Sequence, residues 1–374
     1  MADALNIRRN LAAIPGWSTR RKLVIFESDD WGSIRMPSVE TYKSLHAAGI
    51  DLTSDDGVLF NRYDSLETTA DLAGLFEVLI SVKDYMNRPA VFTPLAIVAN
   101  PDFRKIKESD YTAYSFEPFT DTLLRNSGCD GTFNLWQEGI RRRLFVPQFH
   151  GREHLNVKVW MEALNNGNRM SRIGFDHCFW GMSTVHEPDI GLEFQAAFDF
   201  SDPADIVYQA DVIDTGLVLF KDIFGYRASY FAPPNGPFSS ELESKLADNG
   251  VKYLFMPRIQ SEPLGQGKVK KRLHWLGKRN PSGLRIITRN CFFEPVIQGT
   301  DWVDHCLSDI SIAFRWHKPA IISTHRVNYI GALYPENRKN GLDKLHELLK
   351  RIMKNWPDAE FITTDELGRI IDGN

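Results

Sequence analysis

Short apolar runs alternate with longer amphipathic segments along most of this sequence. Residues 89–98 and 320–324 are almost continuously apolar, which is typical of strands buried on both faces. Residues 65–85 and 204–224 carry apolar side chains at helical spacing. With seven or eight such strands, the alternation predicts a parallel α/β sheet, either a barrel or a doubly wound sheet.

The strand predicted at residues 22–32, KLVIFESDDWG, ends in carboxylates. An apolar run there stops abruptly at Glu27, and Asp29 and Asp30 follow. Neighbouring charges at the end of a buried strand are costly unless they meet a cation or do chemistry. In parallel α/β folds ligands bind at the carboxyl ends of the strands. The alternative is a solvated turn that caps the next helix.

Histidines follow two other predicted strands. His150 and His154 form the motif HGREH after the strand at 144–149, and His325 follows the strand at 320–324. Histidines four apart at a helix start face the same side, so they could share one ion with an aspartate. Such a site leaves a position open for water, and zinc is the simplest ion for it. Taken alone, an HxxxH pair also arises by chance on helices.

The composition excludes several classes of function. The 374 residues carry a formal charge of −4, which gives no support for binding to nucleic acid or to an anionic membrane. The first residues lack the apolar core of a signal peptide, and residues 90–99 are too short to span a membrane. We therefore expect a cytoplasmic protein. The dinucleotide and P-loop phosphate motifs are absent, and nothing indicates an oligomeric state.

The order of these motifs resembles the polysaccharide deacetylases, the NodB-homology carbohydrate esterases. Five motifs of that family have counterparts here, in the family's order: FESDD ending at Asp30, His150–His154, APPNG at 232–236, Asp301-Trp302, and IISTH ending at His325. The closing FITTDEL at 361–367 is also similar to the end of that family. The resemblance covers residues 21–370.

This resemblance implies a distorted (β/α)7 barrel with additional loops and helices. We expect a single catalytic domain over 1–374, with the barrel at about 21–370 and insertions at about 50–85, 100–143 and 167–205.

The family's functional residues carry over by position. The resemblance assigns Asp30, His150 and His154 as ligands of a divalent metal ion. Asp29 would be the base that takes a proton from the metal-bound water, and His325 the acid that protonates the leaving amine. The metal and the backbone N–H of Asn235 would hold the oxyanion. The remaining substrate-binding assignments are Trp302, Asp301 and Trp31. The substrate would be an acetylated sugar or glycan.

Three departures from the family pattern affect this hypothesis. Ala232 stands where the family has an arginine that orients the base, and Arg227 and Arg326 are the candidates to replace it. Trp31 replaces a glycine, which would narrow the mouth of the pocket. The gap between Asp30 and His150 is long and implies extra elements beside the barrel.

The leading hypothesis is a metal-dependent hydrolase that removes an acetyl group, most simply N-acetyl, from a carbohydrate. Two alternatives remain open. One is a catalytically silent glycan-binding protein that lost turnover with the arginine. The other is a glycoside hydrolase on a related barrel, which would need two carboxylates on opposite sides of a glycosidic bond.

Overall fold

The computed structural model describes residues 9–10, 13–54, 57–187 and 189–373. Most of the N-terminal segment considered above as a possible leader, residues 1–8 and 11–12, lies outside these ranges. Among the helices that the structure describes, none combines the length and apolar character needed to cross a bilayer.

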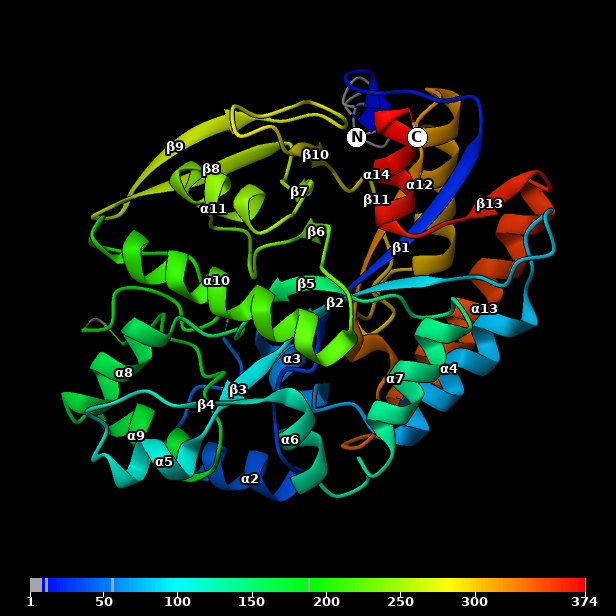
Figure 1. Ribbon diagram of the computed structural model, residues 1–374. Coiled ribbons are helices and arrows are strands. Elements are labelled where there is room, and N and C mark those ends of the chain that lie inside the picture. Colours follow the sequence, from blue (N-terminus) through cyan, green and yellow to red (C-terminus); the bar gives the residue numbers. More distant parts are fainter. Residues whose placement is uncertain (1–8, 11–12, 55–56, 188, 374) are drawn as a thin grey trace.

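Parallel strands curl into a barrel at the centre of the molecule (Figure 1). In spatial order they are β10 (Arg285–Ile287), β7 (Tyr253–Phe255), β6 (Tyr230–Phe231), β5 (Gln148–Gly151), β2 (Phe92–Ile97), β1 (Lys22–Trp31), β12 (Ala320–His325) and β11 (Cys291–Phe292). Each neighbouring pair runs in parallel, and β13 (Ala359–Phe361) pairs with the start of β1.

The two ends of this strand order are consecutive in sequence. Only residues 288–290 separate β10, which pairs with β7, from β11, which pairs with β12. The two therefore act as one interrupted strand that closes the sheet on itself. Counted this way, the barrel has seven strand positions. The expected distorted (β/α)7 barrel is confirmed, and the doubly wound alternative is wrong.

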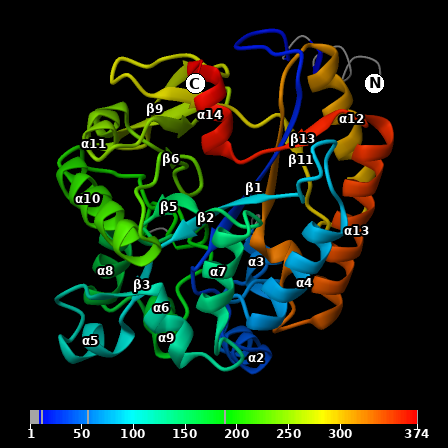
Figure 2. The same cartoon turned by 45° about the vertical axis from the view of Figure 1, so that its right-hand side comes forward.

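Helices surround the barrel (Figure 2). They are α2 (Val39–Ala47), α3 (Gly57–Tyr63), α4 (Thr69–Ser81), α5 (Phe103–Glu108), α6 (Phe119–Arg125), α7 (Thr132–Arg141), α8 (Val157–Asn165), α9 (Arg169–Asp176), α10 (Asp205–Phe224), α11 (Glu243–Asp248), α12 (Trp302–Arg315), α13 (Pro335–Asn355) and α14 (Thr364–Asp372), with short 3₁₀ turns η1 (Ser240–Leu242) and η2 (Arg326–Tyr329). Two antiparallel hairpins complete the fold: β3 (Ala99–Pro101) with β4 (Phe116–Pro118), and β8 (Ile259–Gly265) with β9 (Lys268–Leu273).

Strand β1 is buried on both faces, as its apolar run predicts. Leu23 and Ile25 point into the barrel interior, where they pack with Leu95, Ile287 and Ile321, whereas Val24 and Phe26 belong to the larger core under the outer helices. This alternation places Glu27 and Asp29 on the interior side as well, directly above the interior apolar layer.

Several short helices gather at one end of the barrel. In both views α2, α5, α6, α8 and α9 lie below the strands, while the β8–β9 hairpin and α14 lie at the opposite end (Figures 1 and 2). Residues 57–63 form α3, residues 169–176 form α9, and residues 259–273 form the β8–β9 hairpin.

Candidate active site

A bulge at the end of β1 turns two adjacent aspartates into the same site. Consecutive residues of a strand normally point to opposite faces, so Asp29 and Asp30 should diverge. The pairing of β1 with β2 shifts between Ser28 and Trp31, and Asp30 has a positive φ of 76°. A bulge re-aims side chains in this way, at a backbone cost of about 1–3 kcal/mol for a non-glycine residue. Both carboxylates therefore line one cavity.

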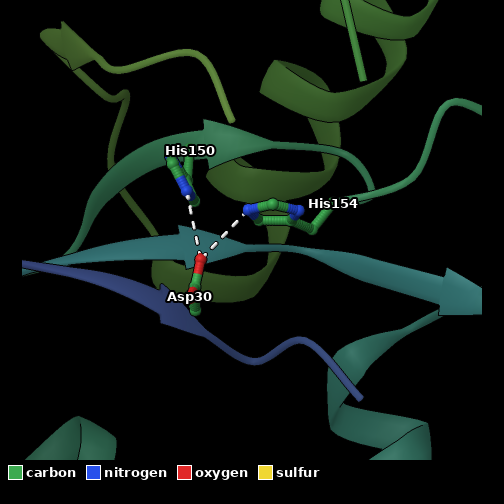
Figure 3. Close-up of side chains that lie close together, drawn as sticks. All are labelled: Asp30, His150 and His154. Carbon is green, nitrogen blue, oxygen red and sulfur yellow. Dashed lines mark ion pairs between the residues drawn. The ribbon is translucent and has the colours of Figure 1, made fainter. Parts of the chain in front are cut away.

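Asp30, His150 and His154 converge in the structure (Figure 3). The Oδ1 atom of Asp30 lies 3.5 Å from Nε2 of His150 and 3.1 Å from Nε2 of His154. All three side chains are buried, and each offers a ligand atom within 4.8 Å of the others. His150 comes from β5 and Asp30 from β1, so the barrel brings together residues that are 120 positions apart.

The donor set fits a divalent ion. His150 is oriented by a 2.7 Å hydrogen bond between Nδ1 and the carbonyl oxygen of Ala232, which directs Nε2 toward Asp30. Burial lowers the pKa of His154 to about 4 despite the Asp30 carboxylate, so this imidazole is neutral, the form that binds metal. Burial opposes the charge of Asp30, but His154 and His150 hold the pKa of this carboxyl well below its usual value.

Arg289 holds the second aspartate. Its Nη1 and Nη2 atoms donate to the two oxygens of Asp29 at 2.7 and 2.6 Å, and its Nε donates to Glu27 at 2.7 Å. Although burial would raise it, the pKa of Asp29 is lowered by the charge and hydrogen bonds of Arg289. Tyr230 and Thr364 donate to Glu27, so the carboxylate behind the arginine is itself fixed. Asp29 is therefore ionised and held in one orientation.

His325 lies beside Asp29, as its register partner on the neighbouring strand β12. Its Nε2 is 3.7 Å from Asp29 Oδ2, and its Nδ1 contacts Glu294 Oε1 at 2.6 Å. Burial alone would lower the pKa of His325, but Glu294 and Asp29 raise it to about 10. Asn328 donates to the other oxygen of Glu294 at 2.7 Å. The imidazole is therefore protonated at neutral pH, with a carboxylate that fixes its orientation.

These groups open into a cavity of about 300 Å³. It is lined by Asp29, Asp30, Arg35, Phe60, His150, His154, Gln195, Pro233, Asn235, Gly236, Phe255, Pro257 and His325. Asn235 has a φ of 54°, a left-handed conformation that asparagine tolerates better than most residues. The turn after β6 thus brings the Asn235 backbone to the cavity.

Three residues expected in substrate binding lie elsewhere. Asp301 accepts hydrogen bonds from the N–H groups of Val303 and Asp304 as the N-cap of α12. Trp302 bonds to the Ile297 carbonyl, and neither residue lines the cavity. Trp31 is fully buried among aromatic rings outside the barrel. The shared reason is position: all three stand beside the strand ends but outside the barrel interior.

Neither arginine suggested as the replacement for the family's arginine reaches Asp29. Arg227 is exposed, and Arg326 is fully buried in ion pairs with Asp64 and Glu67. Arg289 is the arginine that contacts Asp29. Sequence reasoning missed Arg289 because it lies in the three-residue break between β10 and β11, where no strand periodicity indicates which way a side chain points. It missed Glu294 for a similar reason, since β11 is only two residues long.

The fold and this cluster define an α/β barrel with a candidate metal centre at the carboxyl ends of its strands. No family model matches the sequence, and no curated protein matches it. Solved structures are similar at low identity.

PuuE allantoinase has 10% identity and a TM-score of 0.48, covering 95% of this chain and 93% of the other. A probable polysaccharide deacetylase from Pseudomonas aeruginosa PAO1 has 9% identity and a TM-score of 0.47, covering 94% and 91%. A point mutant of the peptidoglycan deacetylase PdaC from Bacillus subtilis has 11% identity and a TM-score of 0.35, covering 94% and 92%.

Proposed function

We propose that this protein is a metal-dependent hydrolase that removes an acetyl group, most simply N-acetyl, from a carbohydrate. The observation that carries the proposal is the pairing of two sets of groups at one cavity. One set, Asp30 with His150 and His154, suits a divalent ion. The other set, Asp29 and His325, supplies an ionised carboxylate and a protonated imidazole side by side.

Asp30, His150 and His154 would hold the ion, with zinc as the simplest choice for one carboxylate and two imidazoles. A bound ion of this kind lowers the pKa of water and polarises a carbonyl. The buried, preoriented His150 ring and the neutral His154 ring are the chain's own contribution to binding it.

Asp29 would accept the proton of the attacking water. Its lowered pKa keeps it ionised at neutral pH, and the two hydrogen bonds from Arg289 aim it. His325 would donate a proton to the leaving amine, since its raised pKa keeps it charged. The backbone N–H of Asn235 would stabilise the oxyanion from the turn after β6, a preorganised electrostatic role.

The silent glycan-binding alternative depended on the missing arginine at Ala232. Arg289 contacts Asp29 through both terminal nitrogens, which removes the main reason to expect a loss of turnover.

The test combines metal analysis with a screen for acetate release from acetylated sugars and sugar nucleotides. We expect about one divalent ion per chain and acetate release from at least one substrate. His150→Ala and His154→Ala should lose the ion. Asp29→Asn should keep the ion but lose about 10²- to 10⁴-fold in rate, the usual contribution of a positioned base.

Reducing ends in place of acetate would point to a glycosidase. Sugar binding without release of either product would favour the silent binding protein. Undiminished acetate release by Asp29→Asn would refute the assignment of the base.

A further inference from the structure

An arginine that has no role in the chemistry described above lies in the wall of the cavity. Arg35 follows β1 and is about 5% exposed. It lines the cavity together with Asp30, His154 and Gln195.

Most hydrogen-bonding capacity of Arg35 is unused. Within the described part of the chain, its one side-chain hydrogen bond runs from Nη1 to Gln195 Oε1 at 2.9 Å. Its Nε lacks a hydrogen-bond partner. Nε and Nη2 take part in longer ion pairs, with Asp64 Oδ2 at 3.5 Å and Asp30 Oδ2 at 3.6 Å, both beyond the usual N–H···O range.

Two other arginines with buried side chains, Arg289 and Arg326, provide a comparison. Arg289 donates to Glu27, Asp29 and Ser323 from all three of its nitrogens. Arg326 donates to Asp64 and Glu67, also from all three. Every guanidinium nitrogen of Arg289 and Arg326 thus has a hydrogen-bond partner, whereas the Nε of Arg35 has none.

The Arg35 head group is held in place nonetheless. Its guanidinium carbon lies 5.0 Å from the centre of the Trp180 ring and 5.7 Å from that of Phe60. Together with the Gln195 bond, these rings fix the group before any ligand arrives. A fixed guanidinium in a cavity wall, with hydrogen-bonding capacity left over, is suited to recognition of an oxyanion.

We infer that Arg35 is a specificity-determining residue that binds an anionic substituent, a carboxylate or a phosphate, on the substrate. This inference rests on the proposed function, because it places the substituent on the same sugar whose acetyl group lies at the candidate metal centre. Trp180 and Gln195 come from the 167–205 insertion and Phe60 from α3, so the added elements of this barrel build the subsite.

The experiment compares three probes: N-acetylglucosamine, its 6-phosphate, and N-acetylmuramic acid, which are neutral, phosphorylated and carboxylated. Binding to the zinc-loaded protein is measured by calorimetry in the Asp29→Asn background, where turnover does not interfere. We expect at least one charged probe to bind about tenfold or more tightly than the neutral sugar. Arg35→Gln should remove most of that preference, and Gln195→Ala should reduce it by releasing the guanidinium.

Arg104→Gln, which alters an arginine on the exposed α5, is the matched control and should leave the preference intact. Zinc content is measured for every variant. Equal affinity for the three probes, including absence of binding by all, would overturn the inference. Loss of zinc by Arg35→Gln would also overturn the inference, since it would show that Arg35 acts by holding the metal ligand Asp30 in position. If Arg35→Gln does not fold, Arg35→Lys and Gln195→Ala are tested in its place. An unchanged preference for charged probes in both variants overturns the inference.

The measurements distinguish failure of the proposed function from failure of this inference. Preference for a charged probe without acetate release from any probe or screened sugar would contradict the deacetylase and leave the anion subsite supported. Acetate release with no preference for charged probes would support the deacetylase and contradict the subsite.

Discussion

At the scale of single residues, the arginine that contacts Asp29 comes from an unexpected place, the break between β10 and β11. Arg289 is held by Glu27 behind it and binds both oxygens of Asp29 in front. Lysine would keep the charge but offers a single point contact, so Arg289→Lys should leave Asp29 free to rotate. We expect kcat/KM for acetate release to fall roughly 10- to 100-fold, with zinc content unchanged.

Arg279→Lys is a suitable control because that arginine is more exposed and pairs with Asp372, away from the cavity. Equal rates for wild type and Arg289→Lys would show that the orientation of Asp29 does not limit the reaction.

Glu294 sets the pH range of His325. Because Glu294 and Asp29 raise the pKa of His325 to about 10, the ring is protonated at neutral pH and loses its proton as the pH rises through that value. A step that needs this proton should therefore proceed at neutral pH and slow on the alkaline side. Glu294→Gln removes one raising charge while burial still lowers the pKa. The alkaline limb of kcat/KM against pH should move down by about 1–3 pH units.

The acid limb provides an internal control for this measurement. It belongs to Asp29, whose pKa is lowered mainly by Arg289, so activity should decline only at acid pH and Glu294→Gln should shift that limb less. An unchanged alkaline limb would mean that His325 is not the acid.

At the scale of elements, the sequence predicted the strands on which the site residues lie. It did not predict the local backbone geometry that brings those residues together. The long apolar runs located β1, β2 and β12, because burial on both faces leaves a clear signal. The bulge in β1 left none, since a shift in pairing depends on the neighbouring strand. The predicted site residues Asp29, Asp30, His150, His154, Asn235 and His325 line the cavity.

The cavity residues that were not identified from the sequence are positioned by contacts between elements far apart in the chain. Arg35 is held at the cavity by a hydrogen bond to Gln195 and by the ring of Trp180, both far from it in sequence. Glu294 reaches His325 through the short strand β11, whose two residues show no periodicity. Asp301 and Trp302 match a motif in order and composition, yet they begin a helix outside the barrel.

The close packing of α13 on η2 holds Asn328 in place, and Asn328 donates a hydrogen bond to Glu294 beside His325. A Cβ atom added to Gly341 in α13 would lie 1.7 Å from the carbonyl oxygen of Asn328, the residue that holds Glu294. Gly341→Ala should therefore force the two elements apart and lower the free energy of unfolding by about 1–3 kcal/mol or more, measured by urea denaturation. Activity should decline as well, because Asn328 moves.

Gly74→Ala in α4 is the matched control. An added Cβ there meets only the end of the Leu342 side chain, at 2.9 Å, which can move aside. Alanine is also the better helix former by up to about 1 kcal/mol, so this variant should be near neutral or stabilised. A Gly341→Ala protein as stable as the wild type would show that η2 adjusts freely.

At the scale of the whole molecule, the site depends on closure of the barrel. The candidate ligands come from β1 and from the end of β5, with β2 between them, and the carboxylate–imidazole pair comes from β1 and β12. Arg289 lies in the interruption between β10 and β11, where the barrel closes. An ion held by Asp30, His150 and His154 would therefore cross-link strands that are not adjacent.

This arrangement predicts that metal and folding are coupled. An ion that binds only the folded chain stabilises it by RT ln(1 + [L]/Kd), which is about 4 kcal/mol at a thousandfold excess over Kd. Chelation should thus lower the thermal midpoint, and added zinc should restore it. His150→Ala should abolish the zinc-dependent shift, whereas His46→Ala, on the exposed face of α2, should retain it. A midpoint that does not respond to chelator or zinc would argue against a metal centre in this barrel, whatever the activity screen gives, because a buried donor set bridging β1 and β5 cannot bind an ion without stabilising their association.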